Sequence, residues 1–238
     1  MSEEYTADNL FDRHTPRSRL EAQHEKEISR EKALATRCLG LNGGDVLSIG
    51  SGWHPGRHLF PSPDWRLTAV DPEEDRPRYA LEQGLADEAF TGAAGALDHL
   101  PDVSFDAVLY RYVLHHVVFH QPLEPVLAEA RRLLRPGGVA VVIEPGLFHP
   151  VGAGLALVNR LGLGVRVHGT PDDIPLSPLA LVSDVRRAGL IPEVHAVSYS
   201  WRRLPVAAQR VVSALDRLGS APGARWLGHT FMLLARRR

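Results

Sequence analysis

The chain is predicted to fold as an α/β domain built on a doubly wound parallel sheet, and two observations carry this prediction. Strand-like and helix-like segments alternate from residue 45 to residue 143, which is the order that a parallel sheet requires. In addition, the apolar run at 46–49 ends in a glycine-rich turn, and the next one, at 67–70, ends in Asp71. Strand, glycine turn and acid in this order are typical of a nucleotide-type cofactor site, where glycines let the backbone approach the ligand and the acid accepts from ribose hydroxyls.

The individual elements follow from hydrophobic periodicity and from signals at their ends. Residues 18–39 are predicted to form a charged helix with a thin apolar stripe, stopped by Gly40 and the Asn-Gly-Gly run that follows. The helix after the glycine turn is expected to be short, because one proline opens it and two more close it. The other expected helices are 77–84, 123–134 and 178–187, and the expected strands are 46–49, 67–70, 88–91, 105–109, 139–143, 194–199 and 230–235.

Composition indicates a soluble globular protein. The 238-residue chain has a formal net charge of −1, so neither a nucleic acid nor a membrane is expected as a partner. Its start does not resemble a signal peptide, and no apolar stretch is long enough to span a bilayer. Cys38 is the only cysteine, which excludes an intrachain disulfide and favours a cytoplasmic location. The 12 histidines show no metal-ligand spacing, so no metal is predicted.

Three further segments follow Asp71 in a fixed order. They are Phe-Asp-Ala-Val at 105–108, Val-Leu-His-His-Val at 113–117, and an Arg-Pro-Gly-Gly turn at 135–138. With these segments, residues 45–145 resemble the class I S-adenosylmethionine-dependent methyltransferases, and in particular their small-molecule branch with a Leu-His-His-Val segment. The resemblance implies a Rossmann-like methyltransferase fold, with a mostly parallel seven-stranded sheet whose last strand is antiparallel.

The resemblance also divides the chain. Residues 1–44 would form an N-terminal helical cover over the cofactor, and residues 45–238 would form the methyltransferase domain. Within that domain, residues from about 145 to 176 would form a lid insert beside the substrate. This lid is rich in glycine, proline and apolar side chains, which suggests a largely hydrophobic acceptor, although such a stretch can equally be core or a dimer surface.

The resemblance implies a binding site for S-adenosyl-L-methionine. In the family, the glycine turn approaches the methionine and ribose parts of the cofactor, and the acid after the second strand accepts from the ribose. Residues beside the adenine and backbone after the fourth strand complete the site. The matching residues are Gly50, Ser51, Gly52, Asp71, Pro72, Ala93, Ala94, Tyr110 and Arg111.

Two positions depart from the family pattern. The family usually has an acid in the first strand, where this chain has Ser48, and another beside the adenine, where this chain has Ala93. Both acids help to hold the cofactor, directly or through water. Their absence implies either weaker binding or compensation by other residues, for example from the N-terminal segment.

Three residues are candidates for catalysis. Methyl transfer to a hydroxyl is helped by a base with a pKa near neutrality, and His115 and His116 follow the fourth strand at the edge where ligands collect. Glu144 ends the neighbouring strand on the same edge and would orient the base. Neighbouring residues of a helix point in different directions, so at most one histidine is expected to face the acceptor. The other histidine, or Glu144 itself, can instead serve the structure.

The leading interpretation is an S-adenosylmethionine-dependent methyltransferase that acts on a small, apolar organic acceptor, most simply at a hydroxyl, as in natural-product biosynthesis. A second interpretation is a methyltransferase-fold scaffold, cyclase or isomerase that binds the cofactor without transferring its methyl group, which the departures at Ser48 and Ala93 keep open. A third is a nicotinamide oxidoreductase, against which the His-His and Arg-Pro-Gly-Gly segments count. The acceptor, the atom methylated and the choice between monomer and homodimer stay open.

Overall fold

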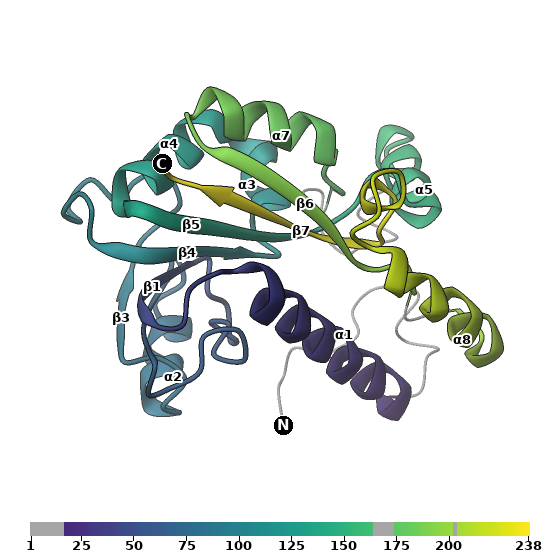
Figure 1. Cartoon of the computed structure of the whole chain (residues 1–238), viewed down its shortest axis with the longest axis horizontal. Helices are drawn as coiled ribbons and strands as arrows, with labels where there is room; N and C mark the ends of the chain where they lie inside the picture. Colours follow the sequence, from purple (N-terminus) through teal and green to yellow (C-terminus); the bar gives the residue numbers. More distant parts are fainter. Residues whose placement is uncertain (1–16, 164–173, 202–203) are drawn as a thin grey trace.

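A seven-stranded sheet with helices on both faces forms the protein (Figure 1). The structure is a computed structural model that describes residues 17–163, 174–201 and 204–238. The strands are β1 (Gly44–Ile49), β2 (Trp65–Asp71), β3 (Glu88–Thr91), β4 (Phe105–Arg111), β5 (Leu134–Pro145), β6 (Ile191–Ser198) and β7 (Thr230–Arg236). Their order is β3-β2-β1-β4-β5-β7-β6. Strands β1 to β5 are parallel, and β7 runs antiparallel to β5 and β6, which confirms the predicted fold class.

The helices lie on both faces of the sheet and beyond one end of its strands (Figure 1). They are α1 (Arg17–Cys38), α2 (Asp75–Glu82), α3 (Leu114–His120), α4 (Leu123–Leu133), α5 (Pro150–Arg160), α7 (Pro178–Arg187) and α8 (Val206–Ala214), with short 3-10 helices η3 (Leu215–Leu218) and η4 (Ala224–Trp226). Helices α3, α4 and α7 cover one face, and α1 and α2 cover the other. Side chains alternate between the two faces, as a strand requires: Leu47 and Ile49 pack with α4 and α7, whereas Val46 packs with α1.

Several predicted end signals act as expected. The Ser177 hydroxyl accepts from the Ala180 N–H at 3.3 Å at the start of α7, and Gly189, with φ +78°, follows its end. The helix predicted at 123–134 is observed as α4. Its apolar face is buried, and Val126, Leu127 and Ala130 on this face are fully buried. Local chemistry therefore determines where these helices begin, end and face.

The segment after the glycine turn differs from the prediction. Residues 52–60 form turns instead of a short helix. Two glycines of this segment, Gly52 and Gly56, have positive φ, and Pro55 lies between them, so no run of helical residues can propagate. The Arg57 side chain holds the loop by donating to the carbonyls of Trp65 at 3.0 Å and Leu85 at 3.1 Å.

Two other differences concern strand length and a helix. Strand β5 begins at Leu134 rather than near residue 139, with a register shift opposite Phe105 and Ala107, so the Arg-Pro-Gly-Gly segment lies within the strand. Helix α8 was not expected from the sequence.

The ends of the predicted lid, residues 145–176, are joined to each other. The Leu147 N–H donates to the Leu176 carbonyl at 2.8 Å, and the Leu176 N–H donates to the Pro145 carbonyl at 2.9 Å. Helix α5 lies between them, and residues 164–173 of the insert lie outside the described residues. None of the described helices is long and apolar enough to cross a membrane.

Candidate cofactor and active site

The carboxyl ends of the parallel strands bring the predicted site residues to one edge of the sheet. Ile49 pairs with Val70 of β2 and with Tyr110 of β4. The glycine turn, Asp71 and Arg111 come directly after these three residues, so they lie side by side at the end of the strands. Glu144 comes directly after Ile143, the partner of Arg111. This edge is where open parallel sheets bind their ligands.

The glycine turn has two glycines with different requirements. Gly50 has φ +64°, and a Cβ there would overlap the Val113 side chain, so the turn passes directly beneath the residue that precedes α3. Gly52 has φ +53°, and a Cβ there would meet nothing within 4 Å. The Ser51 hydroxyl between them is buried without a hydrogen-bond partner in the described part of the chain. A backbone with open space beside it and an unsatisfied buried hydroxyl fits a ligand that approaches the turn closely.

Asp71 is bound to this turn. It is 1% exposed, and its carboxylate accepts from the Gly52 N–H at 2.8 Å and from the Glu73 N–H at 3.1 Å. Arg76 Nη1 lies 3.5 Å from the same carboxylate. Two carboxylate oxygens accept about four hydrogen bonds, so the acid retains capacity for ribose hydroxyls while it fixes the turn.

Replacing Asp71 by alanine is expected to weaken S-adenosylhomocysteine binding by about 1–3 kcal/mol, because buried hydroxyls and the Gly52 N–H would lose their charged acceptor. Calorimetric titration measures this loss, and thermal unfolding shows whether the variant is folded. Glu74→Gln is the matched control, since Glu74 is an exposed acid three residues after Asp71. Equal affinity of Asp71→Ala and wild type would remove Asp71 from the site.

The remaining predicted cofactor residues differ in how deeply their side chains are buried. Pro72 is exposed beside Asp71, and Ala93 and Ala94 lie just beyond β3, whose Thr91 pairs with Asp71. The Tyr110 side chain is fully buried and its hydroxyl donates to the Val126 carbonyl at 3.3 Å. Only the Tyr110 backbone is therefore left for a ligand, as the resemblance implies.

Ser48 and Arg111 lie in the neighbouring strands β1 and β4. Ser48, at the position where the family usually has an acid, is 2% exposed within β1. The Arg111 guanidinium, in contrast, turns toward α1, where its Nε donates to Glu31 at 2.9 Å. The Arg111 side chain is therefore part of an ion pair with the N-terminal helix.

The candidate catalytic residues come together as a buried pair. His115 Nδ1 lies 2.6 Å from Glu144 Oε2, and both side chains are almost completely buried. Since Nδ1 faces the carboxylate, any exchange of a proton with an acceptor has to use Nε2. The His116 ring is centred 4.0 Å from the His115 ring and is tilted by 40°, and His116 does not share the Glu144 contact of its neighbour. The structure thus distinguishes the two histidines.

Glu144 also has the structural role that the sequence left open as an alternative. Its Oε1 accepts from the Val113 N–H at 2.9 Å and from the Leu114 N–H at 2.6 Å, the free donors at the beginning of α3. One oxygen therefore anchors the turn after β4 while the other contacts His115. The position of the carboxylate does not depend on the histidine.

Glu31 is the residue that sequence reasoning missed. It lies in α1, is 0% exposed, and contacts His58, Arg111 and Tyr112. Although burial alone would raise its pKa, the Arg111 charge and the hydrogen bonds from His58 and Arg111 hold the pKa of Glu31 below its usual value. The sequence contains one signal of this burial. Glu31 precedes the buried Leu34 and Ala35 by three and four residues, and this spacing places all three on the same face of the helix.

Helix α5, within the predicted lid, is capped by a histidine. His149 Nδ1 accepts from the Val151 N–H at 3.2 Å, and Nε2 donates to the Tyr199 carbonyl at 3.1 Å. This pattern requires the neutral ring. Burial lowers the pKa of His149, and the bond to Tyr199 offsets only part of that effect. Protonation would remove the cap and place a positive charge at the helix N-terminus beside the ring of His229, 5.2 Å away.

A pH dependence of stability follows for His149. Its pKa is lower in the folded protein than in the unfolded chain, where it is about 6.5, so the unfolded chain takes up the proton first as the pH falls. The free energy of unfolding should therefore decrease below a pH of about 6.5 and be unaffected above it. His149→Asn keeps a capping acceptor and does not titrate, so urea unfolding should show the wild type losing more stability than the variant in acid. Both proteins should be measured from about pH 5 to pH 8. Parallel curves of their unfolding free energies against pH would contradict this prediction.

The central part of the chain is similar to known methyltransferases. Residues 47–142 match the family model described as a methyltransferase domain. A thiol S-methyltransferase of Homo sapiens is 33% identical over 135 residues, which are 52% of this chain and 52% of that protein. A sterol 24-C-methyltransferase of Gibberella zeae is 31% identical over 127 residues, which are 50% of this chain and 33% of that protein. The matched residues thus span about half or less of these curated relatives.

Solved structures share the fold over most of the chain. An S-adenosylmethionine-dependent methyltransferase of Thermotoga maritima has a TM-score of 0.64 and 17% identity, covering 93% of this chain and 94% of that one. The 1,6-didemethyltoxoflavin-N1-methyltransferase of Burkholderia thailandensis, solved with 1,6-didemethyltoxoflavin and S-adenosylhomocysteine, has a TM-score of 0.55 and 20% identity, covering 92% and 82%. The solved structures thus share the Rossmann-like fold of this chain, and residues 47–142 match a methyltransferase domain.

Proposed function

We propose that this protein transfers a methyl group from S-adenosylmethionine to a small, largely apolar organic acceptor, and that a hydroxyl is the favoured acceptor group. The observation that carries this proposal is the buried contact of 2.6 Å between His115 and Glu144, at the same sheet edge as the glycine turn and Asp71. A hydroxyl has to lose its proton during methylation, and a histidine backed by a carboxylate is suited to take it.

The residues around the glycine turn supply the binding of the cofactor, whose sulfonium carries an already activated methyl group. Residues 50–52 with Asp71 would hold the ribose and methionine parts, and Pro72 with residues 93–94 would lie beside the adenine. The backbone at 110–111 would contact the methionine portion. With an activated donor, the protein has mainly to align the acceptor and exclude water.

His115 and Glu144 would supply the proton transfer. Glu144 keeps the His115 proton on Nδ1, so that Nε2 presents its lone pair to the acceptor hydroxyl. Once His115 has taken the proton, the imidazolium lies against a carboxylate, which stabilises its charge. The two backbone N–H groups at Val113 and Leu114 hold Glu144 in place throughout.

The acceptor is proposed to be apolar because of the lid. Helix α5 has apolar side chains on several sides, including the half-buried Leu155 and Val158 and the exposed Leu157. Deleting residues 152–164 should abolish turnover and leave cofactor binding largely intact if this segment covers the acceptor. Equal loss of both would make the segment part of the core.

A thiol is the second candidate acceptor group. It is supported by the 33% identity to a human thiol S-methyltransferase. A thiol with a pKa of about 8.5 ionises far more readily than an alcohol, so its methylation depends less on a base.

The test uses acceptors that share one ring system and differ only in carrying a hydroxyl, a thiol or an amine. Release of S-adenosylhomocysteine is measured with the wild-type protein, and binding of S-adenosylmethionine, S-adenosylhomocysteine and NAD is measured by calorimetry. Preference for the hydroxyl, with a base dependence in the pH profile, supports the proposal. Preference for the thiol favours the second candidate. Conversion of an acceptor without S-adenosylhomocysteine release would favour a cyclase or isomerase, and binding of NAD alone would favour an oxidoreductase.

A further inference from the structure

Glu31 is unusual for its helix. Other charged side chains of α1, such as Glu25 and Lys32, are exposed, yet the Glu31 carboxylate is completely buried. Burying a carboxylate is unfavourable unless charges and donors compensate it. Here His58 Nε2 lies 3.0 Å from Oε2, Arg111 Nε donates to Oε2 at 2.9 Å, and the Tyr112 hydroxyl lies 3.3 Å from Oε1. The compensation comes entirely from outside α1.

The partners of Glu31 all flank the glycine turn. His58 follows that turn along the chain, Arg111 ends β4, the strand beside β1, and Tyr112 is the next residue. Burial, together with the nearby Glu31 charge, raises the pKa of the Tyr112 hydroxyl, so it stays protonated and donates to Glu31. Through these contacts α1 is connected to the loops that surround the predicted cofactor.

Tyr112 is also the most constrained residue of the turn after β4. Its φ is +55°, a left-handed conformation that non-glycine residues adopt at a cost. The next residue, Val113, packs so closely against Gly50 that a Cβ on Gly50 would overlap the Val113 side chain. A change in Tyr112 is therefore transmitted to the glycine turn through one residue.

Two buried carboxylates hold this short turn, one from the sheet and one from a helix. Glu144 of β5 accepts from the Val113 and Leu114 N–H groups, and Glu31 of α1 contacts the side chains of Arg111 and Tyr112. Strain in a turn persists only where its surroundings fix it. Glu144 belongs to the same sheet as the turn, whereas Glu31 is a contact between the sheet and a separate helix.

We propose that Glu31 is a positioning residue for the cofactor: its contacts with Arg111 and Tyr112 hold the turn after β4 in the conformation that binds S-adenosylmethionine, and they couple the docking of α1 to occupancy of the site. This inference rests on the proposed cofactor site but not on methyl transfer or on the role of His115. Because coupling between two events is reciprocal, cofactor bound at the turn must also stabilise the docked helix.

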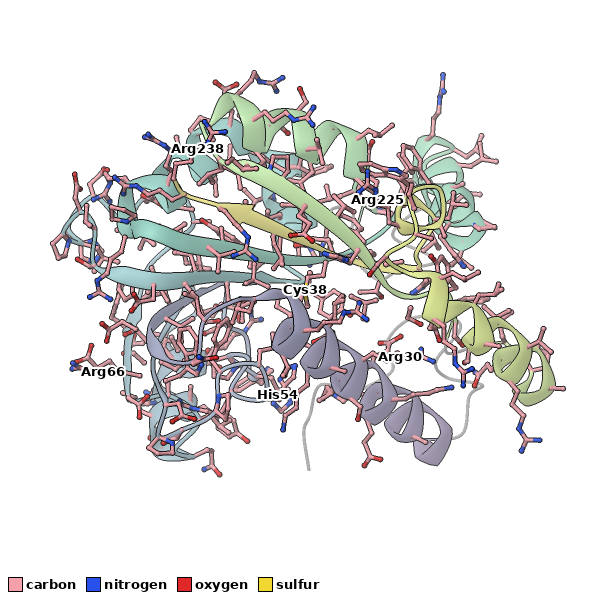
Figure 2. The ribbon with its side chains drawn as sticks, viewed as in Figure 1. Arg30, Cys38, His54, Arg66, Arg225 and Arg238 are labelled. Atoms are coloured by element: carbon pink, nitrogen blue, oxygen red, sulfur yellow. The ribbon has the colours of Figure 1, made fainter. Side chains whose placement is uncertain are left out.

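Other contacts should keep α1 in place when Glu31 is changed. Lys26 Nζ donates to the Ser213 hydroxyl at 2.8 Å, and Arg30 donates to the Ser198 hydroxyl at 2.9 Å and pairs with Asp216. Figure 2 shows Arg30 extending from α1 on the side of α8. Substitution of Glu31 therefore removes one contact among several, and the variant is expected to fold.

The test measures binding and helix protection in the absence of any acceptor. Glu31→Gln should weaken S-adenosylhomocysteine binding by about 5- to 150-fold, the usual range of coupling between sites. Tyr112→Phe, which loses the hydroxyl contacts with Glu31 and Thr230 but keeps the Glu31–Arg111 ion pair, should weaken it by about 2- to 5-fold. Glu25→Gln, an exposed acid on the same helix, is the matched control and should bind as the wild type does.

Hydrogen exchange supplies the second readout. Adding S-adenosylhomocysteine to the wild type should slow amide exchange in residues 24–38, and this slowing should be lost in Glu31→Gln and reduced in Tyr112→Phe. A folded Glu31→Gln with wild-type affinity, or wild-type exchange that the ligand does not change, would overturn the inference while leaving the proposed cofactor intact. If Glu31→Gln does not fold, Tyr112→Phe decides by the same two measurements. A wild type that binds no S-adenosylhomocysteine would overturn the proposed function and this inference together.

Discussion

Replacing His115 by glutamine is expected to slow methyl transfer to a hydroxyl by about 10²- to 10⁴-fold, the usual contribution of a general base. Glutamine can still donate to Glu144, so the substitution removes the base while keeping a polar neighbour for the carboxylate. Single-turnover transfer at saturating cofactor, measured across a pH series, isolates the chemical step from binding. The wild-type rate should fall as the histidine becomes protonated, and the variant should lose this dependence.

His116→Gln is the matched control for this prediction. The two residues are adjacent on α3 and their ring centroids are 4.0 Å apart, but it is His115 whose Nδ1 contacts Glu144, at 2.6 Å. His116→Gln should therefore transfer at close to the wild-type rate. If His115→Gln also transfers at that rate, alignment of the two substrates alone drives the reaction and His115 is structural.

The fold was predictable because its signals are local. The run from Val46 to Gly50 contains both the apolar strand and the residue that has to adopt a positive φ beside Val113. The Ser177 cap and Gly189 bound α7 through contacts a few residues apart. Such features need only hydrophobic periodicity and end chemistry. The antiparallel last strand, in contrast, was expected only through the family resemblance.

The contacts within the site were less predictable because they join distant parts of the chain. Glu31 and Arg111 are 80 residues apart in sequence, and nothing local to Arg111 indicates that its side chain turns toward α1. Likewise, the sequence placed Glu144 at the correct sheet edge but did not show that it anchors the backbone of Val113 and Leu114. Residue types and strand ends predict which groups gather, whereas tertiary packing decides which of them bind one another.

The second large effect is expected for Glu144→Gln, through the tautomer of His115. The amide oxygen of glutamine can still accept from the Val113 and Leu114 N–H groups, which leaves its NH₂ group facing His115 Nδ1. Since that NH₂ group only donates, Nδ1 has to become the acceptor and the ring proton moves to Nε2. A ring protonated at Nε2 cannot take a proton from the acceptor hydroxyl.

Glu144→Gln should therefore slow transfer about as strongly as His115→Gln, by up to about 10⁴-fold, as a carboxylate-to-amide change does when it fixes the wrong histidine tautomer. Nitrogen chemical shifts of His115 report the tautomer directly, and the double variant should be no slower than either single one, because both remove the same base. Glu144→Ala should in addition lower the melting temperature, since it leaves the two backbone donors of α3 without their acceptor. A Glu144→Gln variant with the proton on Nε2 and an undiminished transfer rate would show that the His115–Glu144 pair holds α3 in place and takes no proton from the acceptor.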